Sequence, residues 1–249
     1  GCNTEGCFSG ARAIIAPSGT LSFSVPSVTS IPVPIINEGT LAVAGGEVVL
    51  GNSSLHRSGG TINVSSGATL TLAGTATSGP VGGPALHAMD GTSFTGAGSV
   101  IWDGHMIGGT SITNAADLRW RNGLVGFSGT FTNTGTFRPE ASKPMAVGTF
   151  INNGVVAPGS SPGLFALIGN GSTGSGNFTQ GPGGTLLFEL VSPDIAGTTY
   201  DALVAAGDIS LDGTMQLVFL SGFTPSEGDT FDLLSSGGTT TGDFTSVVF

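Results

Sequence analysis

Four consecutive stretches of the chain decide the fold: Gly91-TSFTGAGSVIW, Gly109-TSITNAADLRW, Gly129-TFTNTGTFRPE and Gly148-TFINNGVVAPG. Their glycines follow one another after 18, 20 and 19 residues. Weaker copies begin at Gly60, Gly176 and Gly207. A short, fixed period is the signature of a repeat protein, in which each repeat packs only on its neighbours.

Apolar residues occupy matching places in these repeats and define three columns. Small or polar residues alternate with them, which is the period of a β-strand and not of a helix. The first column holds Phe94, Ile112, Phe131, Phe150 and Phe178, the second holds Val100, Leu118, Phe137 and Val156, and the third holds Met89, Ile107, Phe127 and Ala146.

A bend residue stands four places before the second column. It is Asn114, Asn133 and Asn152 in three repeats, Gly96 in another, and Asn37 in the same relation to Leu41. Asn and Gly tolerate left-handed backbone angles, so we expect a tight bend there between two strands. Stacked asparagines are also expected to hydrogen-bond along the column.

These patterns predict an all-β chain folded as a parallel β-solenoid with coils of 18–20 residues. Each coil would stack on the previous one at about 4.8 Å. We divide the chain into an N-terminal disulfide loop with an extended arm or cap (1–36), solenoid repeats (37–180) and an acidic C-terminal solenoid or capping segment (181–249).

The composition of the 249 residues excludes several other classes of protein. Glycine (44) and proline (13) are abundant, only 9% of residues are charged, and the net charge is −10. Glycine lacks the three-residue period of collagen. The mean hydropathy of +0.32 is too high for a disordered polar chain. No apolar run reaches the roughly 18 residues of a transmembrane helix.

Charge is distributed unevenly along the chain. The segment 181–249 holds nine of the 16 acidic residues and no Lys or Arg. No basic stripe is available to neutralise phosphates, so nucleic acid is not an expected partner.

The two cysteines, Cys2 and Cys7, lie close together at the start of the chain. We expect them to close a small disulfide loop, which indicates an oxidising, extracellular setting for a chain whose signal peptide has been removed. A disulfide between subunits is the alternative. Metal binding is less favoured, because no second Cys or His pair lies nearby.

The C-terminal third carries a resemblance to a known family. NNGVVAPGSSPGLFALIGNGSTGSGNFTQGPGGTLLFEL is followed by YDALVAAGDISLDGTMQLVFLSGFTPSEGDTFDLL and then by GDF. This stretch resembles the right-handed parallel β-helix of bacterial surface proteins, including autotransporter passenger domains and filamentous-haemagglutinin-like adhesins. The resemblance covers residues 130–249 well and 35–130 only through the repeat. It implies a right-handed β-helix and export to the cell surface, and it specifies no activity.

Several motifs suggest chemistry that their context does not support. Gly159–Gly163 fits G-x-S-x-G, but no histidine follows it in the chain. Gly169–Gly174 fits G-x-G-x-x-G without a following helix. His87 and His105 each precede a repeat glycine by four residues, so we expect them to stack in adjacent coils as a structural pair. We therefore assign no catalytic, cofactor-binding or metal-binding residue.

Two pairs of residues, one of tryptophans and one of arginines, recur at matching places in successive coils. Trp102 and Trp120 are equivalent, and they form either part of the core or an exposed platform for sugar rings. Arg119 and Arg138 match as well, with Asp103 close to the same register. Polysaccharide lyases and hydrolases share this architecture, but fold alone does not establish catalysis.

The segment 11–36 is nearly uncharged and contains four prolines, so we expect an extended arm. It would either cap its own first coil or add as a strand to a neighbouring copy, because solenoid ends present open strand edges. Its apolar residues are Ile14, Ile15, Leu21, Phe23, Val25, Val33 and Ile35.

The expected function is that of a secreted structural subunit of an extracellular filament, sheath or matrix, without catalysis or cofactor. Self-assembly through the arm or the solenoid ends is the expected partnership. The alternative is an adhesin or carbohydrate-binding passenger that uses loops 74–88 and 157–175 or the tryptophan pair. A polysaccharide lyase or hydrolase is the third reading.

Overall fold

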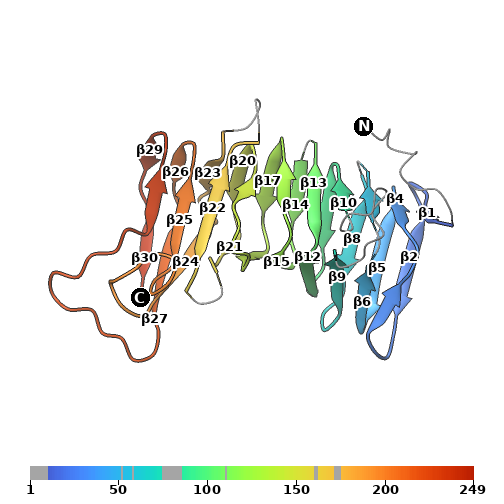
Figure 1. Cartoon of the computed structure of the whole chain (residues 1–249), viewed down its shortest axis with the longest axis horizontal. Helices are drawn as coiled ribbons and strands as arrows, with labels where there is room; N and C mark the ends of the chain where they lie inside the picture. Colours follow the sequence, from blue (N-terminus) through green and yellow to red (C-terminus); the bar gives the residue numbers. More distant parts are fainter. Residues whose placement is uncertain are drawn as a thin grey trace.

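The computed structural model describes residues 11–51, 53–57, 59–74, 86–109, 111–159, 162–170 and 175–249. Cys2 and Cys7 lie outside this part of the chain. The described residues form thirty short strands and no helix. Every third strand belongs to the same sheet, and all pairs between named strands are parallel (Figure 1).

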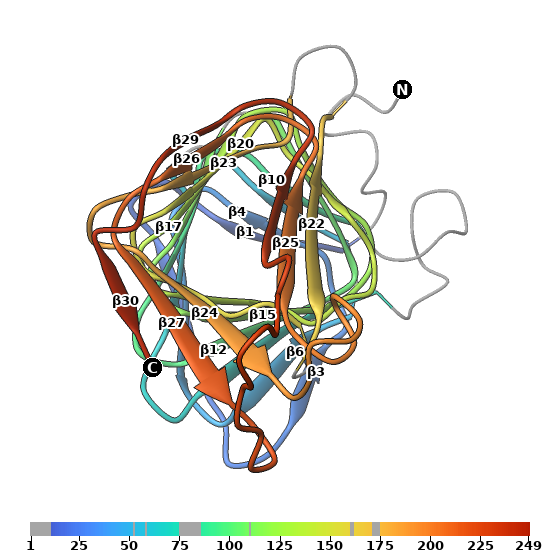
Figure 2. The same ribbon diagram turned by 90° about the vertical axis from the view of Figure 1, so that its left-hand side faces the viewer.

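Three ten-stranded sheets therefore form the sides of a three-sided column, seen end-on in Figure 2. Sheet A contains β1 (Ala13–Ile15), β4 (Ile35–Asn37), β7 (Ser54–His56), β10 (Leu86–Met89), β13 (His105–Gly108), β16 (Val125–Phe127), β19 (Met145–Ala146), β22 (Leu164–Ile168), β25 (Ala202–Ala205) and β28 (Leu234–Ser236). Sheet B contains β2 (Thr20–Ser24), β5 (Thr40–Gly45), β8 (Thr61–Val64), β11 (Thr92–Thr95), β14 (Ser111–Asn114), β17 (Thr130–Asn133), β20 (Thr149–Asn152), β23 (Asn177–Gln180), β26 (Ile209–Leu211) and β29 (Thr240–Gly242). Sheet C contains β3 (Thr29–Ile31), β6 (Glu47–Leu50), β9 (Thr69–Ala73), β12 (Ser99–Asp103), β15 (Asp117–Asn122), β18 (Thr136–Pro139), β21 (Val155–Val156), β24 (Thr185–Leu190), β27 (Thr214–Phe219) and β30 (Ser246–Val248).

The parallel β-solenoid predicted from the repeats is confirmed. The second apolar column is correct throughout, because Val100, Leu118, Phe137 and Val156 pair in that order. In the first column, Ile112, Phe131, Phe150 and Phe178 pair as predicted. The exception is Phe94, which pairs with Asn114.

The third column is wrong at two of its positions, Ile107 and Ala146, which both pair with Gly126 on the outer face. Gly108 takes the place between Met89 and Phe127 that the prediction gave to Ile107, and Ile107 faces outward. Because the side-chain period of a strand is two, this shift of one residue moves the side chain to the other face.

The interior is filled by aromatic rings stacked along the column axis. The ring centroids of Phe131 and Phe150 lie 5.0 Å apart, and those of Phe150 and Phe178 lie 5.9 Å apart, both pairs nearly parallel. Trp102 packs edge-on against Phe131 and Phe94. Each coil therefore contributes large apolar area to a continuous core.

A buried amide ladder runs beside these rings, as the sequence predicts. Nδ2 of Asn114 donates to Oδ1 of Asn133, and Nδ2 of Asn133 donates to Oδ1 of Asn152, both at 2.8 Å. Nδ2 of Asn152 then donates to Oε1 of Gln180 at 2.9 Å. The ladder holds the corner between sheets B and C, whereas Asn37 ends β4 at the corner between sheets A and B.

The segment predicted to be an extended arm forms the first coil of the solenoid. Residues 13–31 form β1, β2 and β3, which pair with β4, β5 and β6 of the same chain. The expected division at residue 36 is therefore not a structural boundary, because the three sheets run on through it. Of the arm residues, Ile15 and Ile35 are buried and Leu21, Phe23 and Val25 pack partly against the core. Val33 lies between β3 and β4, and Ile14 is exposed.

Candidate functional site

The outer face of sheet A carries an apolar stripe along the long axis of the molecule. Ile14, Ile107 and Ile168 are 58%, 43% and 41% exposed, whereas Ile36 and Leu55 are buried. Residues in parallel register share one face, so these side chains form one continuous line. In order along the axis the stripe consists of Ile14, Ile36, Leu55, Ala88, Ile107, Gly126, Ala146 and Ile168.

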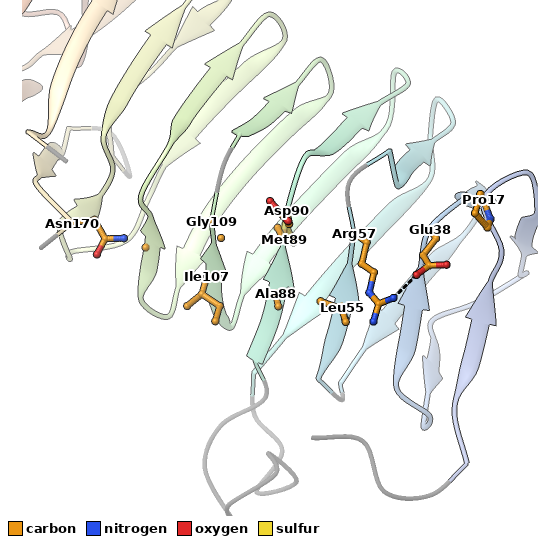
Figure 3. A pocket seen from close by; sticks show the side chains of 12 residues that line it. Pro17, Glu38, Leu55, Arg57, Ala88, Met89, Asp90, Ile107, Gly109 and Asn170 are labelled. Carbon is orange, nitrogen blue, oxygen red and sulfur yellow. Dashed lines mark hydrogen bonds and ion pairs between the residues drawn. The ribbon is translucent and has the colours of Figure 1, made fainter. Parts of the chain in front are cut away.

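An open groove of about 930 Å³ lies along this stripe, where sheet A turns into sheet B. Leu55, Ala88 and Ile107 line it from three neighbouring strands, as Figure 3 shows. Asn170 comes from the predicted contact loop 157–175, whereas Ala88 belongs to strand β10, so the second of the two predicted contact loops contributes to the groove.

The polar rim of the groove comes from the turns between the two sheets. Nη1 of Arg57 lies 2.5 Å from Oε1 of Glu38, and this pair joins two neighbouring coils (Figure 3). Asp90 lines the same edge one coil further on. No aromatic side chain is among the described residues that line the groove.

The outer face of sheet C carries a network of ion pairs. Arg119 and Arg138 are in register, as predicted. Asp117 lies 3.8 Å from Arg119 and 3.3 Å from Arg138, and Glu140 lies 3.7 Å from Arg119 and 3.5 Å from Arg121. Both carboxylates are thus shared between guanidinium groups. Exposed pairs of this kind add little stability.

Asp103 does not join this network. It pairs with Asn122 in the next strand, across an irregularity that follows Trp102 and Trp120. The sequence predicts that Asp103 lies close to the register of Arg119. In the structure Arg119 pairs with Ile101, which is two residues before Asp103.

The tryptophan pair is core. Trp102 and Trp120 are in register, but both are 0% exposed. An exposed platform for sugar rings is therefore ruled out at these residues, because a ring must present one face to solvent to stack on a glycan. Nε1 of Trp120 donates to the carbonyl of Asn122 at 3.0 Å.

The histidine stack differs from the prediction. His87 pairs with Met106, so it does not stack on His105. It contacts the preceding coil, where Oγ of Ser54 lies 2.6 Å from Nδ1 of His87 and 2.9 Å from Nε2 of His56. Burial lowers the pKa of His56 to about 3, with a smaller contribution from His87, and lowers that of His87 to about 4. Both rings are therefore neutral and structural at neutral pH.

A buried carboxylate that the sequence did not reveal lies near a second, smaller pocket. Asp201 accepts hydrogen bonds from the backbone N–H of Gly163 at 2.6 Å and of Glu189 at 2.8 Å. Burial outweighs these bonds and raises the pKa of Asp201 to about 7. The pocket, of about 280 Å³, is lined by Gly163, Lys143 and Glu140 among others. A lone Asp in a turn-rich segment gives no sequence signal of such burial.

The remaining motifs form no site in the described ranges. Ser161 of G-x-S-x-G and residues 171–174 of G-x-G-x-x-G lie outside them. Within those ranges no group of three His, Cys, Asp or Glu is arranged to hold a metal ion. No helix there has the length and apolar character needed to cross a membrane. Neither a protein-family model nor a curated protein nor a solved structure matches the chain.

Proposed function

We propose that the protein is a secreted structural β-solenoid subunit that self-associates into an extracellular filament, sheath or matrix and performs no catalysis. The apolar stripe of sheet A carries this proposal. Soluble monomers rarely expose long contiguous apolar surfaces, and those that exist usually mark an interaction site. Five consecutive residues of the stripe, from Ala88 to Ile168, are at least partly exposed and none is charged, so this part of the stripe is such a surface.

A second copy of the chain is the partner that fits this stripe. The exposed part of the stripe combines large side chains with small ones: Ile107 is followed by Gly126 and Ala146, and then by Ile168. Two such faces can interdigitate at the spacing of about 10 Å at which sheets pack. Because the same surface is used on both copies, this contact is isologous and closes a dimer. The chain has a net charge of −10, but the stripe contains no charged residue, so the centre of the contact is free of like-charge repulsion. Extension into a filament then uses a second contact, at the open strand edges of the solenoid ends.

The bacterial cell surface is the proposed location. The resemblance of residues 130–249 to exported β-helix proteins supports it, as does the cysteine pair near the start of the chain. Among known exported proteins, we propose autotransporter-like passengers as the group to which this chain is most similar. Detection of the native protein in the culture medium or on intact cells, and its absence from the cell interior, tests the location.

The test of self-association is a concentration series by sedimentation velocity with negative-stain electron microscopy. We expect oligomers for the native chain, and loss of them in Ile107→Glu and Ile168→Glu. Val28→Glu is the matched control, because Val28 is 64% exposed and lies outside the stripe. A monomer at every concentration, or equal loss in the control, contradicts the proposal.

The groove favours a second function, that of an adhesin or carbohydrate-binding module. The predicted contact loop 157–175 supplies the Asn170 amide to it, and its rim also offers carboxylates. Sites for extended ligands are concave and combine apolar walls with a few polar groups. A glycan array tests this function. Binding that Asn170→Ala weakens and Trp102→Phe leaves intact supports it, and an array without signal excludes it.

A further inference from the structure

Sheet B presents an outer face unlike those of the other two sheets. One outward position is in register through all ten of its strands, and nine of the ten residues there are Thr or Ser. In order along the axis they are Thr20, Thr40, Thr61, Ser93, Thr113, Thr132, Ile151, Thr179, Ser210 and Thr241.

A second line of polar residues runs beside the first. In β14, β17, β20 and β23 the residue two places earlier is Ser111, Thr130, Thr149 and Asn177, so these strands read Ser-x-Thr, Thr-x-Thr, Thr-x-Ile and Asn-x-Thr. All of these side chains are at least partly exposed. None of the ten strands of sheet B contains Asp, Glu, Lys, Arg or His.

The spacing of this array follows from strand geometry. Neighbouring strands lie about 4.7–4.9 Å apart, and alternate residues of one strand lie about 6.4–6.8 Å apart. The hydroxyl and methyl groups of the threonines therefore form a two-dimensional lattice. Oxygen atoms on the prism faces of hexagonal ice repeat at similar distances in two perpendicular directions.

The interior holds this lattice rigid. The strands that carry Thr132, Ile151 and Thr179 are backed by the stacked rings of Phe131, Phe150 and Phe178. The same strands end in the amide ladder from Asn133 to Asn152 and Gln180. Threonine is also stiff at χ1, so its hydroxyl and methyl group keep their positions. Water ordered on such a face loses little further entropy when it joins a crystal lattice.

We propose that the outer face of sheet B binds ice. Threonine suits this ligand because its hydroxyl anchors a water molecule and its methyl group fits between lattice waters. Ile151, the one residue of the first line that is neither Thr nor Ser, lacks the hydroxyl but has a branched methyl group on Cβ, as threonine does. Charged groups, which hold hydration shells that do not match ice, are missing from these strands. Outward aromatic rings, which a glycan surface would favour, are missing from them as well.

The test measures thermal hysteresis and partition into a growing ice hemisphere. The variant is Thr113→Tyr with Thr132→Tyr, which places two bulky rings in the middle of the lattice. Tyrosine favours strands, so the fold is expected to persist. The matched control is Thr185→Tyr with Thr214→Tyr, two threonines that are also in register on neighbouring strands but lie on sheet C.

We expect hysteresis and ice partition for the native chain, loss of both in the sheet B variant, and retention of both in the sheet C control. Ile107→Glu should retain them as well, because the proposal does not depend on self-association. Circular dichroism and the unfolding temperature verify that each variant is folded. A native chain without hysteresis, or equal loss in the sheet C control, overturns the proposal. Binding to insoluble cellulose or chitin without partition into ice overturns it too and assigns the face to crystalline polysaccharide.

Discussion

At the scale of single residues, the buried histidines make stability depend on pH. The pKa values of His56 and His87 are lowered to about 3 and about 4, from an ordinary value of 6.5. The unfolded chain therefore binds more protons than the folded chain between these limits, and stability falls as the pH drops from 6.5 towards 4. Urea unfolding between pH 4 and 8 should show this slope. The slope should weaken or reverse in a variant with His56→Gln and His87→Gln, because Asp201 contributes the opposite slope, and it should persist in His105→Gln. Equal slopes in all three chains would contradict the assignment.

Asp201 acts in the opposite direction in the same pH window. Its pKa is raised from 3.8 to about 7, so the folded chain keeps a proton that the unfolded chain has released. Stability contributed by Asp201 is therefore present at low pH and is lost as the pH rises from about 4 to 7. The stability of the native chain minus that of Asp201→Asn should decrease over this range in the same unfolding series. A difference that stays constant with pH would show that Asp201 does not titrate there.

The amide ladder gives a prediction at one residue. Nδ2 of Asn133 donates to Asn152 and to the carbonyls of Gly135 and Val155, so Asn133→Ala leaves buried acceptors without a donor. Each unsatisfied group costs about 1–3 kcal/mol. We expect the free energy of unfolding to fall by at least that amount. Asn153→Ala, at an exposed residue in the corresponding turn of the next coil, should leave it nearly unchanged. Chemical denaturation of both variants provides the measurement. Similar losses of unfolding free energy in both would show that the amide ladder does not stabilise the fold.

At the scale of the element, the corners explain where sequence reasoning succeeded and failed. The Asn ladder was predictable because the residues recur at a constant distance before the second apolar column. Their backbone conformation was not, since Ser221 is the one non-glycine residue with positive φ in the described ranges. The asparagines secure the corner through side-chain hydrogen bonds, whereas Gly96 does so with a φ of +95°. Aligning the two residue types as equivalents misplaced Phe94.

The first coil shows a second limit of the sequence. Four prolines suggested an extended arm, although Leu21, Phe23 and Val25 alternate as in a strand. Parallel pairing joins residues about twenty positions apart, such as Ala13 with Ile35, and no local signal reports that pairing. The surface lines of sheets A and B escaped prediction for the same reason, since they emerge only once the register is known.

Gly96 also provides a test at this scale. A Cβ there would lie 2.1 Å from the carbonyl oxygen of Val64, and its φ is unfavourable for other residues. Gly67 has a φ of +76°, but nothing lies within 4 Å of its Cβ position. Gly67→Ala should therefore cost about 1 kcal/mol for backbone strain alone. Gly96→Ala should cost clearly more, because the neighbouring coil must move. Unfolding temperatures of the two variants compare these costs, and equal values would mean that the corner is not tightly packed.

At the scale of the whole molecule, the three sheets separate three kinds of surface chemistry. Sheet A has the apolar stripe, sheet B the uncharged hydroxyl lattice, and sheet C the ion pairs of Arg119 and Arg138. The amino-acid composition shows only that the chain as a whole has few charged residues, and it does not show on which sheet they lie. A solenoid sorts them because each position in the coil returns to the same side of the column.

This separation predicts how self-association depends on salt. The chain carries a net charge of −10, with nine acids and no base in 181–249, so two copies repel at low ionic strength. Raising the ionic strength from about 0.01 M to 0.15 M shortens the Debye length from about 30 Å to about 8 Å. This change screens the repulsion and leaves the apolar contact of sheet A intact. Sedimentation equilibrium should therefore show stronger association at the higher salt concentration. Association that weakens with salt would instead mean that the acidic segment of one copy binds the arginines of sheet C on another, and Arg119→Glu with Arg138→Glu would then abolish it while Ile107→Glu would not.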